Sequence, residues 1–161
     1  MNSEDVTIIS IVGKQNAGKT TLIKDLIPKL KEQGHRVGTL KYNIRKFDID
    51  HEGKDTYKYS NSGADSIAIS TQSEFVVMKK TANPLTLHEI IEAYFNDVNV
   101  VLVEGYREDG YPRIRIIDPQ DTNAVKTDSQ NELLLVNEKT ENSCFSIDDI
   151  NRAMNFIEKS L

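Results

Sequence analysis

The chain has 161 residues, the length of one ordinary domain, and 38% of them are hydrophobic and 28% charged, a balance typical of a globular protein without a membrane span. Its net charge of −5 argues against the phosphate backbone of a nucleic acid as a partner. The single cysteine, Cys144, excludes an internal disulfide and a multi-cysteine metal site. The acidic start, residues 1–5, lacks the basic and apolar segments of a secretory signal, so we expect a cytoplasmic protein.

In chain order, the first elements alternate between strand and helix. Val6 to Val12 is β-branched and apolar almost throughout, which predicts a central strand buried on both faces of a parallel sheet. Apolar residues then recur at helical spacing over residues 22–30, with Gly34 as a stop signal and Pro28 bending the last turns. Val37 to Lys41 is a second predicted strand. Together these elements predict a right-handed βαβ unit.

The rest of the chain continues this alternation. The polar stretch 42–54 is too long for an ordinary connection, which makes it a candidate functional loop. Beyond it we expect strands at Ser66–Ser70, Phe75–Met78, Val98–Val103, Arg113–Ile117 and Leu133–Val136, and helices at Asp55–Ser62, Leu85–Phe95 and Ile147–Lys159. The predicted fold class is therefore α/β, a mainly parallel sheet flanked by helices, in a single domain over residues 1–161.

The residues between the first strand and the first helix carry a phosphate-binding pattern. The run GKQNAGKT, from Gly13 to Thr20, matches G-x-x-x-x-G-K-[ST] in the strand-to-helix context that the P-loop requires. Glycines let the backbone N–H groups curl around a phosphate, and the helix adds its positive N-terminal end. We predict a nucleotide-binding P-loop made of Gly13, Lys14, Gln15, Asn16, Ala17, Gly18, Lys19, Thr20 and Thr21.

A nucleotide triphosphate implies Mg²⁺, which prefers hard oxygen ligands. The Thr20 hydroxyl is one candidate in this pattern. Glu104 directly follows an apolar strand, and ligands of open α/β sheets gather at the carboxyl ends of strands. Asp48, Asp50 and Asp55 follow the second strand and stay open as further candidates.

Several longer segments are specific enough to indicate a family. They are VGKQNAGKTTLIKDLIPKL at Val12–Leu30, GHRVGTLKY at Gly34–Tyr42, FDIDHEGKDTY at Phe47–Tyr57, SGAD at Ser62–Asp65 and VVLVEGYREDGYPRIRI at Val100–Ile117. Over roughly Ile8 to Ile117 the chain resembles the molybdopterin-guanine dinucleotide biosynthesis protein B family, MobB.

This resemblance implies a P-loop NTPase-type protein that binds GTP, hydrolyses it weakly at most, and is commonly a homodimer. Its expected partners are the molybdenum cofactor guanylyltransferase and the molybdopterin cofactor, and the expected cofactors are GTP and Mg²⁺. By analogy with dethiobiotin synthetase-like proteins, which share the Val-Glu-Gly ending, the Mg²⁺ ligands would be Thr20, Asp55 and Glu104. Asp55 is preferred over Asp50 because a helix that begins at Asp55 would aim its carboxylate toward the P-loop.

The chain departs from the family at one segment. Where the family usually has Lys-His-x-His-His, residues 41–45 read Lys-Tyr-Asn-Ile-Arg, so no role of those imidazoles carries over. Cations near this region could instead meet phosphates of the pterin cofactor or an acidic partner, or form a solvated loop; they are Arg45, Lys46, Lys54 and Arg107. Guanine preference follows from the resemblance alone, because the Asn-Lys-x-Asp pattern is replaced by VNEK at Val136–Lys139.

The leading hypothesis is thus a GTP-binding adaptor in the guanylylation of molybdopterin. The alternative is a P-loop ATP-dependent ligase or kinase of the dethiobiotin synthetase-like group, although no arginine-rich lid segment is visible. A nickel metallochaperone GTPase would need more cysteine and histidine ligands than one cysteine and three scattered histidines provide. No catalytic residue is predicted, and the region beyond Asp118 has no assigned role.

Overall fold

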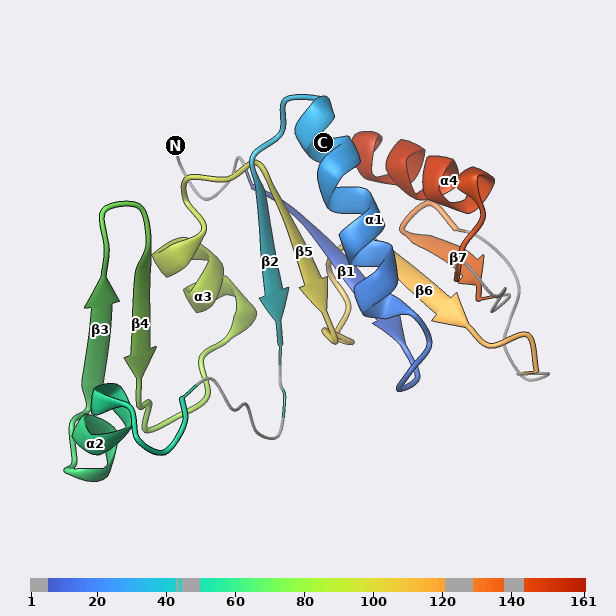
Figure 1. Ribbon diagram of the computed structural model, residues 1–161. Coiled ribbons are helices and arrows are strands. Elements are labelled where there is room, and N and C mark those ends of the chain that lie inside the picture. Colours follow the sequence, from blue (N-terminus) through green and yellow to red (C-terminus); the bar gives the residue numbers. More distant parts are fainter. Residues whose placement is uncertain (1–5, 43, 45–49, 121–128, 138–143) are drawn as a thin grey trace. The chain divides into compact units, whose positions relative to one another are not determined.

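The computed structural model describes residues 6–42, 44, 50–120, 129–137 and 144–161 (Figure 1). Its contacts divide the chain into two compact units, each described here by itself. The larger one, the sheet unit, comprises residues up to 43 together with 87–161, and the smaller one, the hairpin unit, comprises residues 44–86. No helix among the described residues is long and apolar enough to cross a bilayer.

The sheet unit is built on a five-stranded parallel sheet with the order β2-β5-β1-β6-β7. The strands are β1 (Thr7–Gly13), β2 (Val37–Lys41), β5 (Val100–Glu104), β6 (Arg113–Ile117) and β7 (Glu132–Val136). The helices are α1 (Lys19–Glu32), α3 (Leu87–Tyr94) and α4 (Ile147–Glu158). The predicted class, a mainly parallel sheet flanked by helices, is confirmed, and β1 is the central strand as expected.

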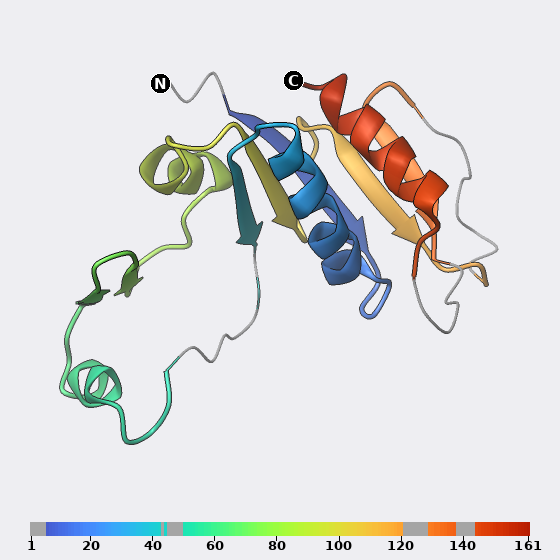
Figure 2. The same ribbon diagram turned by 45° about the horizontal axis from the view of Figure 1, so that its top comes forward.

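Two apolar layers enclose the sheet because successive side chains of a strand point to opposite faces. One layer contains Ile9 and Ile11 of β1 with the buried faces of α1 and α4, which lie side by side on one face of the sheet (Figures 1 and 2). The other contains Ile8 of β1, Val101 and Val103 of β5, and residues of α3. The central strands are therefore buried on both faces, as their continuous apolar sequence predicted.

The helices form where the sequence predicted them, with small differences at their ends. α1 continues through Pro28 to Glu32, and α4 begins with a capping box in which the Ser146 hydroxyl accepts from the Asp149 N–H. α3 is shorter than predicted, beginning at Leu87 and ending at Tyr94. This difference is of the size that helix ends commonly show.

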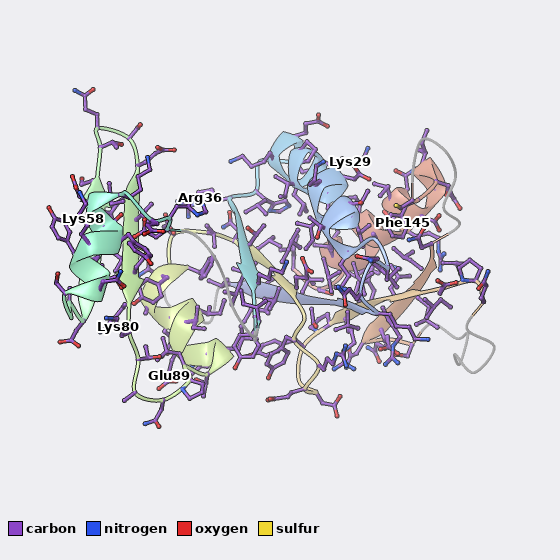
Figure 3. All side chains as sticks on the ribbon, turned by 60° about the horizontal axis from the view of Figure 1, so that its bottom comes forward. Lys29, Arg36, Lys58, Lys80, Glu89 and Phe145 are labelled. Carbon is purple, nitrogen blue, oxygen red and sulfur yellow. The ribbon has the colours of Figure 1, made fainter. Side chains whose placement is uncertain are left out.

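The hairpin unit contains α2 (Asp55–Asn61) and an antiparallel pair, β3 (Ser66–Ser70) and β4 (Phe75–Lys79). The Lys80 ammonium donates to the Ser60 carbonyl at 3.1 Å and joins the end of the hairpin to α2; Lys80 and Lys58 mark the two elements in Figure 3. Much of the apolar surface of the hairpin is exposed, including Phe75 at 68%. Among the strands that the structure describes, these two pair only with each other.

Candidate functional site

The glycine-rich loop lies at the carboxyl edge of the parallel sheet. It joins the end of β1 to the start of α1, and the register of β5 pairs Glu104 with Ile11 of β1 and with Lys41 of β2. Lys41 and Glu104 therefore lie at the edge of the sheet from which the loop leaves. This is the edge where ligands of open α/β sheets gather.

The backbone of the loop requires glycine at two positions. Gly18 has φ +96°, in the left-handed region, and a Cβ there would lie 3.2 Å from the Phe145 ring. A Cβ on Gly13 would lie 2.9 Å from the Ile116 carbonyl oxygen of the neighbouring strand. Asn16 also has a positive φ, of 60°. The two fixed glycines of the sequence pattern thus have a steric reason in this fold.

Lys19 is held across its own loop. The residue is half-buried, and its ammonium donates to the carbonyl oxygens of Gly13 at 3.1 Å and Lys14 at 2.8 Å. The Ala17 N–H also donates to the Lys14 carbonyl, at 3.2 Å. The loop is therefore tightly turned, and the Lys19 ammonium lies against the carbonyls of its first two residues.

Thr20 and Glu104 meet across the edge of the sheet. The Thr20 hydroxyl donates to the Glu104 carboxylate, with 3.3 Å between Oγ1 and Oε2, so a side chain of α1 meets one from the end of β5. Both are hard oxygen donors, which suit Mg²⁺. The pairing brings together two of the three metal ligands that the resemblance implied.

Asp55, the third, lies in the hairpin unit, where its carboxylate pairs with Lys58 at 2.9 Å and is largely exposed. The Asp50 carboxylate instead accepts from the Thr56 hydroxyl and the His51 N–H, both at 3.0 Å. Asp48, Arg45 and Lys46 lie outside the described residues. A role of Asp55 at the loop stays a prediction.

Two residues that hold the loop in place were not predicted from the sequence. Asn137, which directly follows β7, is 1% exposed, and its amide Nδ2 donates to the Ala17 carbonyl at 2.8 Å. Phe145, labelled in Figure 3, is buried against Gly18 just before α4. Asn137 had a detectable signal, because it is a polar residue at the carboxyl end of an apolar strand. Phe145 had none.

The loop lines a hollow of about 490 Å³, here called the loop hollow. Its walls are Gln15, Asn16, Ala17, Gly18, Lys19, Thr20, Thr21, Lys41, Glu104 and Cys144. All of these residues belong to the sheet unit. Most of the loop residues predicted from the sequence are thus gathered around one cavity.

A second hollow of about 520 Å³ adjoins the first and is here called the tyrosine hollow. It shares Gln15, Lys19, Lys41 and Glu104 with the loop hollow, and its other walls are Val12, Gly13, Tyr42, Gly105, Tyr106, Arg107 and Glu108. Burial, together with a hydrogen bond to the Glu108 carboxylate at 3.2 Å, raises the pKa of the Tyr106 hydroxyl above its ordinary value. Tyr106 therefore stays protonated at neutral pH.

Fold and loop define the class: a parallel α/β protein with a G-x-x-x-x-G-K-T loop between its first strand and first helix. The model of the MobB family, described as molybdopterin guanine dinucleotide synthesis protein B, matches residues 8–139. The chain belongs to this family, as its sequence motifs indicated.

Individual relatives support the same family assignment. A Bacillus subtilis protein named "Probable molybdopterin-guanine dinucleotide biosynthesis adapter protein" is 33% identical over 117 residues, which cover 71% of this chain and 66% of the relative. A Haemophilus influenzae adapter protein is 29% identical over 115 residues, 71% of this chain and 64% of the relative. These matches span just under two thirds of either relative. The crystal structure of Bacillus subtilis MobB is 30% identical, with a TM-score of 0.71, and the match covers 96% of this chain and 98% of that one.

Proposed function

We propose that the protein is a GTP-binding adapter in the biosynthesis of the guanine dinucleotide form of molybdopterin. The observation that carries this proposal is the Gly13–Thr20 loop, tightly turned at the carboxyl edge of a parallel sheet, in a chain of the MobB family. The relatives named above are called biosynthesis adapter proteins. The expected partner is the guanylyltransferase, which would perform the chemistry. A cytoplasmic location, which a single cysteine suits, stays a prediction.

The start of α1 suits the phosphates of a nucleotide. Its N-cap is Gly18, its first turn contains no acidic residue, and no described side chain caps this end. The residues of the first turn line the loop hollow, and the N–H groups and dipole of a helix start give positive potential there. The Lys19 ammonium would exchange its loop carbonyls for phosphate oxygens.

Thr20 and Glu104 fit Mg²⁺. A hydroxyl and a carboxylate already within hydrogen-bond distance of each other can share one small cation that keeps several waters. Bound there, Mg²⁺ would neutralise charge on the phosphates. We propose Asp55 as a third ligand on the family analogy alone.

GTP hydrolysis, where it occurs, is proposed to be weak. Among the described residues that line the loop hollow, Glu104 is the only carboxylate and none is a histidine. If Glu104 holds Mg²⁺, the hollow itself supplies no side chain of the kinds that most often act as a general base. This composition favours a protein that binds nucleotide over one that turns it over rapidly.

We also infer a homodimer. A two-stranded hairpin alone is marginally stable in water, and on β3 and β4 the side chains of Ile69, Phe75, Val76 and Val77 are 43–68% exposed. Packing against the same hairpin of a second copy would remove this apolar surface from water and would satisfy strand edges. The hairpin is therefore the proposed dimer contact.

The decisive experiment is a calorimetric titration with GTP and then ATP, with and without Mg²⁺, on the wild-type protein and two variants. Lys19→Ala removes the cation over the loop and should abolish GTP binding. Lys24→Ala, an exposed lysine of the same helix, is the matched control and should bind as the wild type does. Equal GTP affinity in all three proteins would refute the proposed loop function. Preference for ATP would favour the dethiobiotin synthetase-like alternative.

A further inference from the structure

We propose that the protein has a second small-molecule site, for an organic carboxylate with an apolar body, at the amino ends of β6 and β7. The site is a hollow of about 620 Å³, here called the amino-end hollow, formed by Pro112, residues 129–133 and residues within 152–160. Its volume falls within the range of small-molecule sites. It shares no lining residue with the loop hollow or the tyrosine hollow, so the proposal does not depend on nucleotide binding.

The amino-end hollow lies at the opposite end of the sheet from the glycine-rich loop. Pro112 directly precedes β6, and residues 129–131 precede β7. α4 packs beside β7 (Figures 1 and 2), and its second half supplies the other wall. A hydrogen bond from Gln33, just after α1, to Glu158 joins the far ends of α1 and α4. A ligand in this hollow is therefore held away from the carboxyl edge of the sheet.

Apolar side chains form one wall of the amino-end hollow. Leu133 is buried, while Phe156 and Pro112 are half-buried. Phe156 also packs against the core of the sheet unit, which fixes its ring. Removal of such apolar surface from water favours binding in proportion to the area covered. This wall therefore selects a ligand with an apolar body over a small hydrated ion.

Arg152 and Lys159 bring two positive charges to the hollow. The Arg152 guanidinium is held in place, because Nη2 donates to the Leu134 carbonyl at 3.2 Å and Nη1 lies 3.5 Å from the Asp149 carboxylate. An arginine has five N–H donors in a planar fork that matches a carboxylate, so a ligand can share the guanidinium with these two acceptors. Lys159 is exposed and adds its charge at the rim.

The carboxylate of Glu132, the only one among the described residues that line the amino-end hollow, is already paired. Its Oε1 accepts from Nε and Nη2 of Arg115 at 3.0 and 2.7 Å and lies 3.8 Å from Nη1 of Arg113. Neither of these arginines lines the hollow. They offset the charge of Glu132, so Arg152 and Lys159 give the hollow a positive balance in a chain of net charge −5. This balance selects an anion over an amine or a metal cation.

The backbone around the amino-end hollow is preformed. Ser129 and Glu132 exchange backbone hydrogen bonds of 2.8 and 3.3 Å at the start of β7. The end of a helix carries partial negative charge on its last carbonyls, but the carbonyls of residues 155–158 each accept a hydrogen bond from residues 159–161. The end of α4 therefore opposes an anion less than an uncapped helix end does. A preformed wall also lowers the entropic cost of binding.

The test uses 7-diethylaminocoumarin-3-carboxylate, a fluorescent carboxylate with an apolar body, followed by fluorescence anisotropy with the full chain. We expect saturable binding to the wild type and about tenfold weaker binding to Arg152→Gln, which loses a charged hydrogen bond to the probe. Lys159→Gln changes an exposed side chain and should also weaken binding, which keeps the test valid if Arg152→Gln does not fold. Lys24→Gln, an exposed lysine of α1, is the matched control and should bind as the wild type does.

Two further ligands test each half of the proposed chemistry. 7-Diethylaminocoumarin, which keeps the apolar body but lacks the carboxylate, should bind less tightly and with equal affinity to the wild type and Arg152→Gln. Benzoate should displace the probe at lower concentration than acetate, because acetate has almost no apolar body. Equal competition by benzoate and acetate would overturn the role of the apolar wall. Absence of saturable probe binding, or equal probe binding to all variants, would overturn the site itself.

Failure of this proposal can be told apart from failure of the proposed function. Lys19→Ala should bind the probe as tightly as the wild type does, and Lys159→Gln should retain wild-type GTP affinity, because the two sites share no residue. Displacement of the probe by GTP, or loss of probe binding in Lys19→Ala, would overturn the amino-end site. A protein that binds the probe selectively but no GTP would overturn the proposed function and leave this site standing.

Discussion

Removal of the Asn137 amide tests how the fold holds the glycine-rich loop. In Asn137→Ala the Ala17 carbonyl loses a 2.8 Å hydrogen bond from a side chain that is 1% exposed. A buried acceptor left without a donor costs about 1–3 kcal/mol. For a chain of this length each kcal/mol lowers the melting temperature by about 2–4 °C, so a decrease of about 2–12 °C is expected.

The loss of the hydrogen bond from Asn137 should also weaken GTP binding. If the loop keeps its shape in only a fraction of the molecules, the apparent dissociation constant for GTP equals the intrinsic one divided by that fraction, so it rises. A cost of 1–3 kcal/mol sets a ceiling of about 5- to 150-fold on this rise. Thermal melts and GTP calorimetry measure the two effects, with Asn151→Ala, an exposed asparagine of α4, as the control. An Asn137→Ala protein with wild-type melting temperature and GTP affinity would refute the reasoning.

Two further predictions address the metal and the assembly. Glu104→Gln keeps the shape of the side chain but removes its charge, so the Mg²⁺ dependence of GTP binding should weaken more than GTP binding itself; superimposable magnesium titrations would remove Glu104 from the site. Phe75→Ser, which removes the most exposed ring of the hairpin, should lower the dimer fraction in sedimentation velocity runs at micromolar concentration. A wild-type protein that sediments as a monomer with GTP present would contradict the proposed homodimer.

Most of the fold could be predicted because the local patterns agree with the final environments. The β-branched runs at β1 and β5 are buried on both faces of the sheet, and the helical spacing of residues 22–30 matches the buried face of α1. The order β2-β5-β1-β6-β7 could not be predicted in full. It depends on pairings between strands far apart in sequence, for which a single strand carries no local signal.

The pairing of the strands in the hairpin unit could not be predicted either. Both strands of the hairpin were predicted at nearly their observed positions, but alternation within a strand does not reveal its pairing partner. That residues 44–86 make most of their contacts among themselves is therefore visible only in the structure. The Asp55 assignment, which rests on the family analogy and on a helix that begins at Asp55, stays a prediction.

The candidate site, too, could be predicted from the sequence only in part. The loop is readable from the sequence because its glycines and lysine stand within eight consecutive residues, and the spacing itself carries the chemistry. The tyrosine hollow combines Tyr42 after β2, Tyr106 after β5 and loop residues after β1. It exists only because parallel strands end at a common edge, which brings three separate loops together.

That common edge also bears on the missing histidines. Where the family usually has imidazoles after the second strand, this chain places Tyr42 against Tyr106, with Lys41 beside Glu104 in the sheet register. An imidazole can donate, accept and titrate near neutral pH, whereas burial raises the pKa of the Tyr106 hydroxyl above its ordinary value and keeps it protonated in that range. We therefore expect the Tyr106 hydroxyl to contribute no pH dependence to ligand binding at this edge between pH 6 and 8.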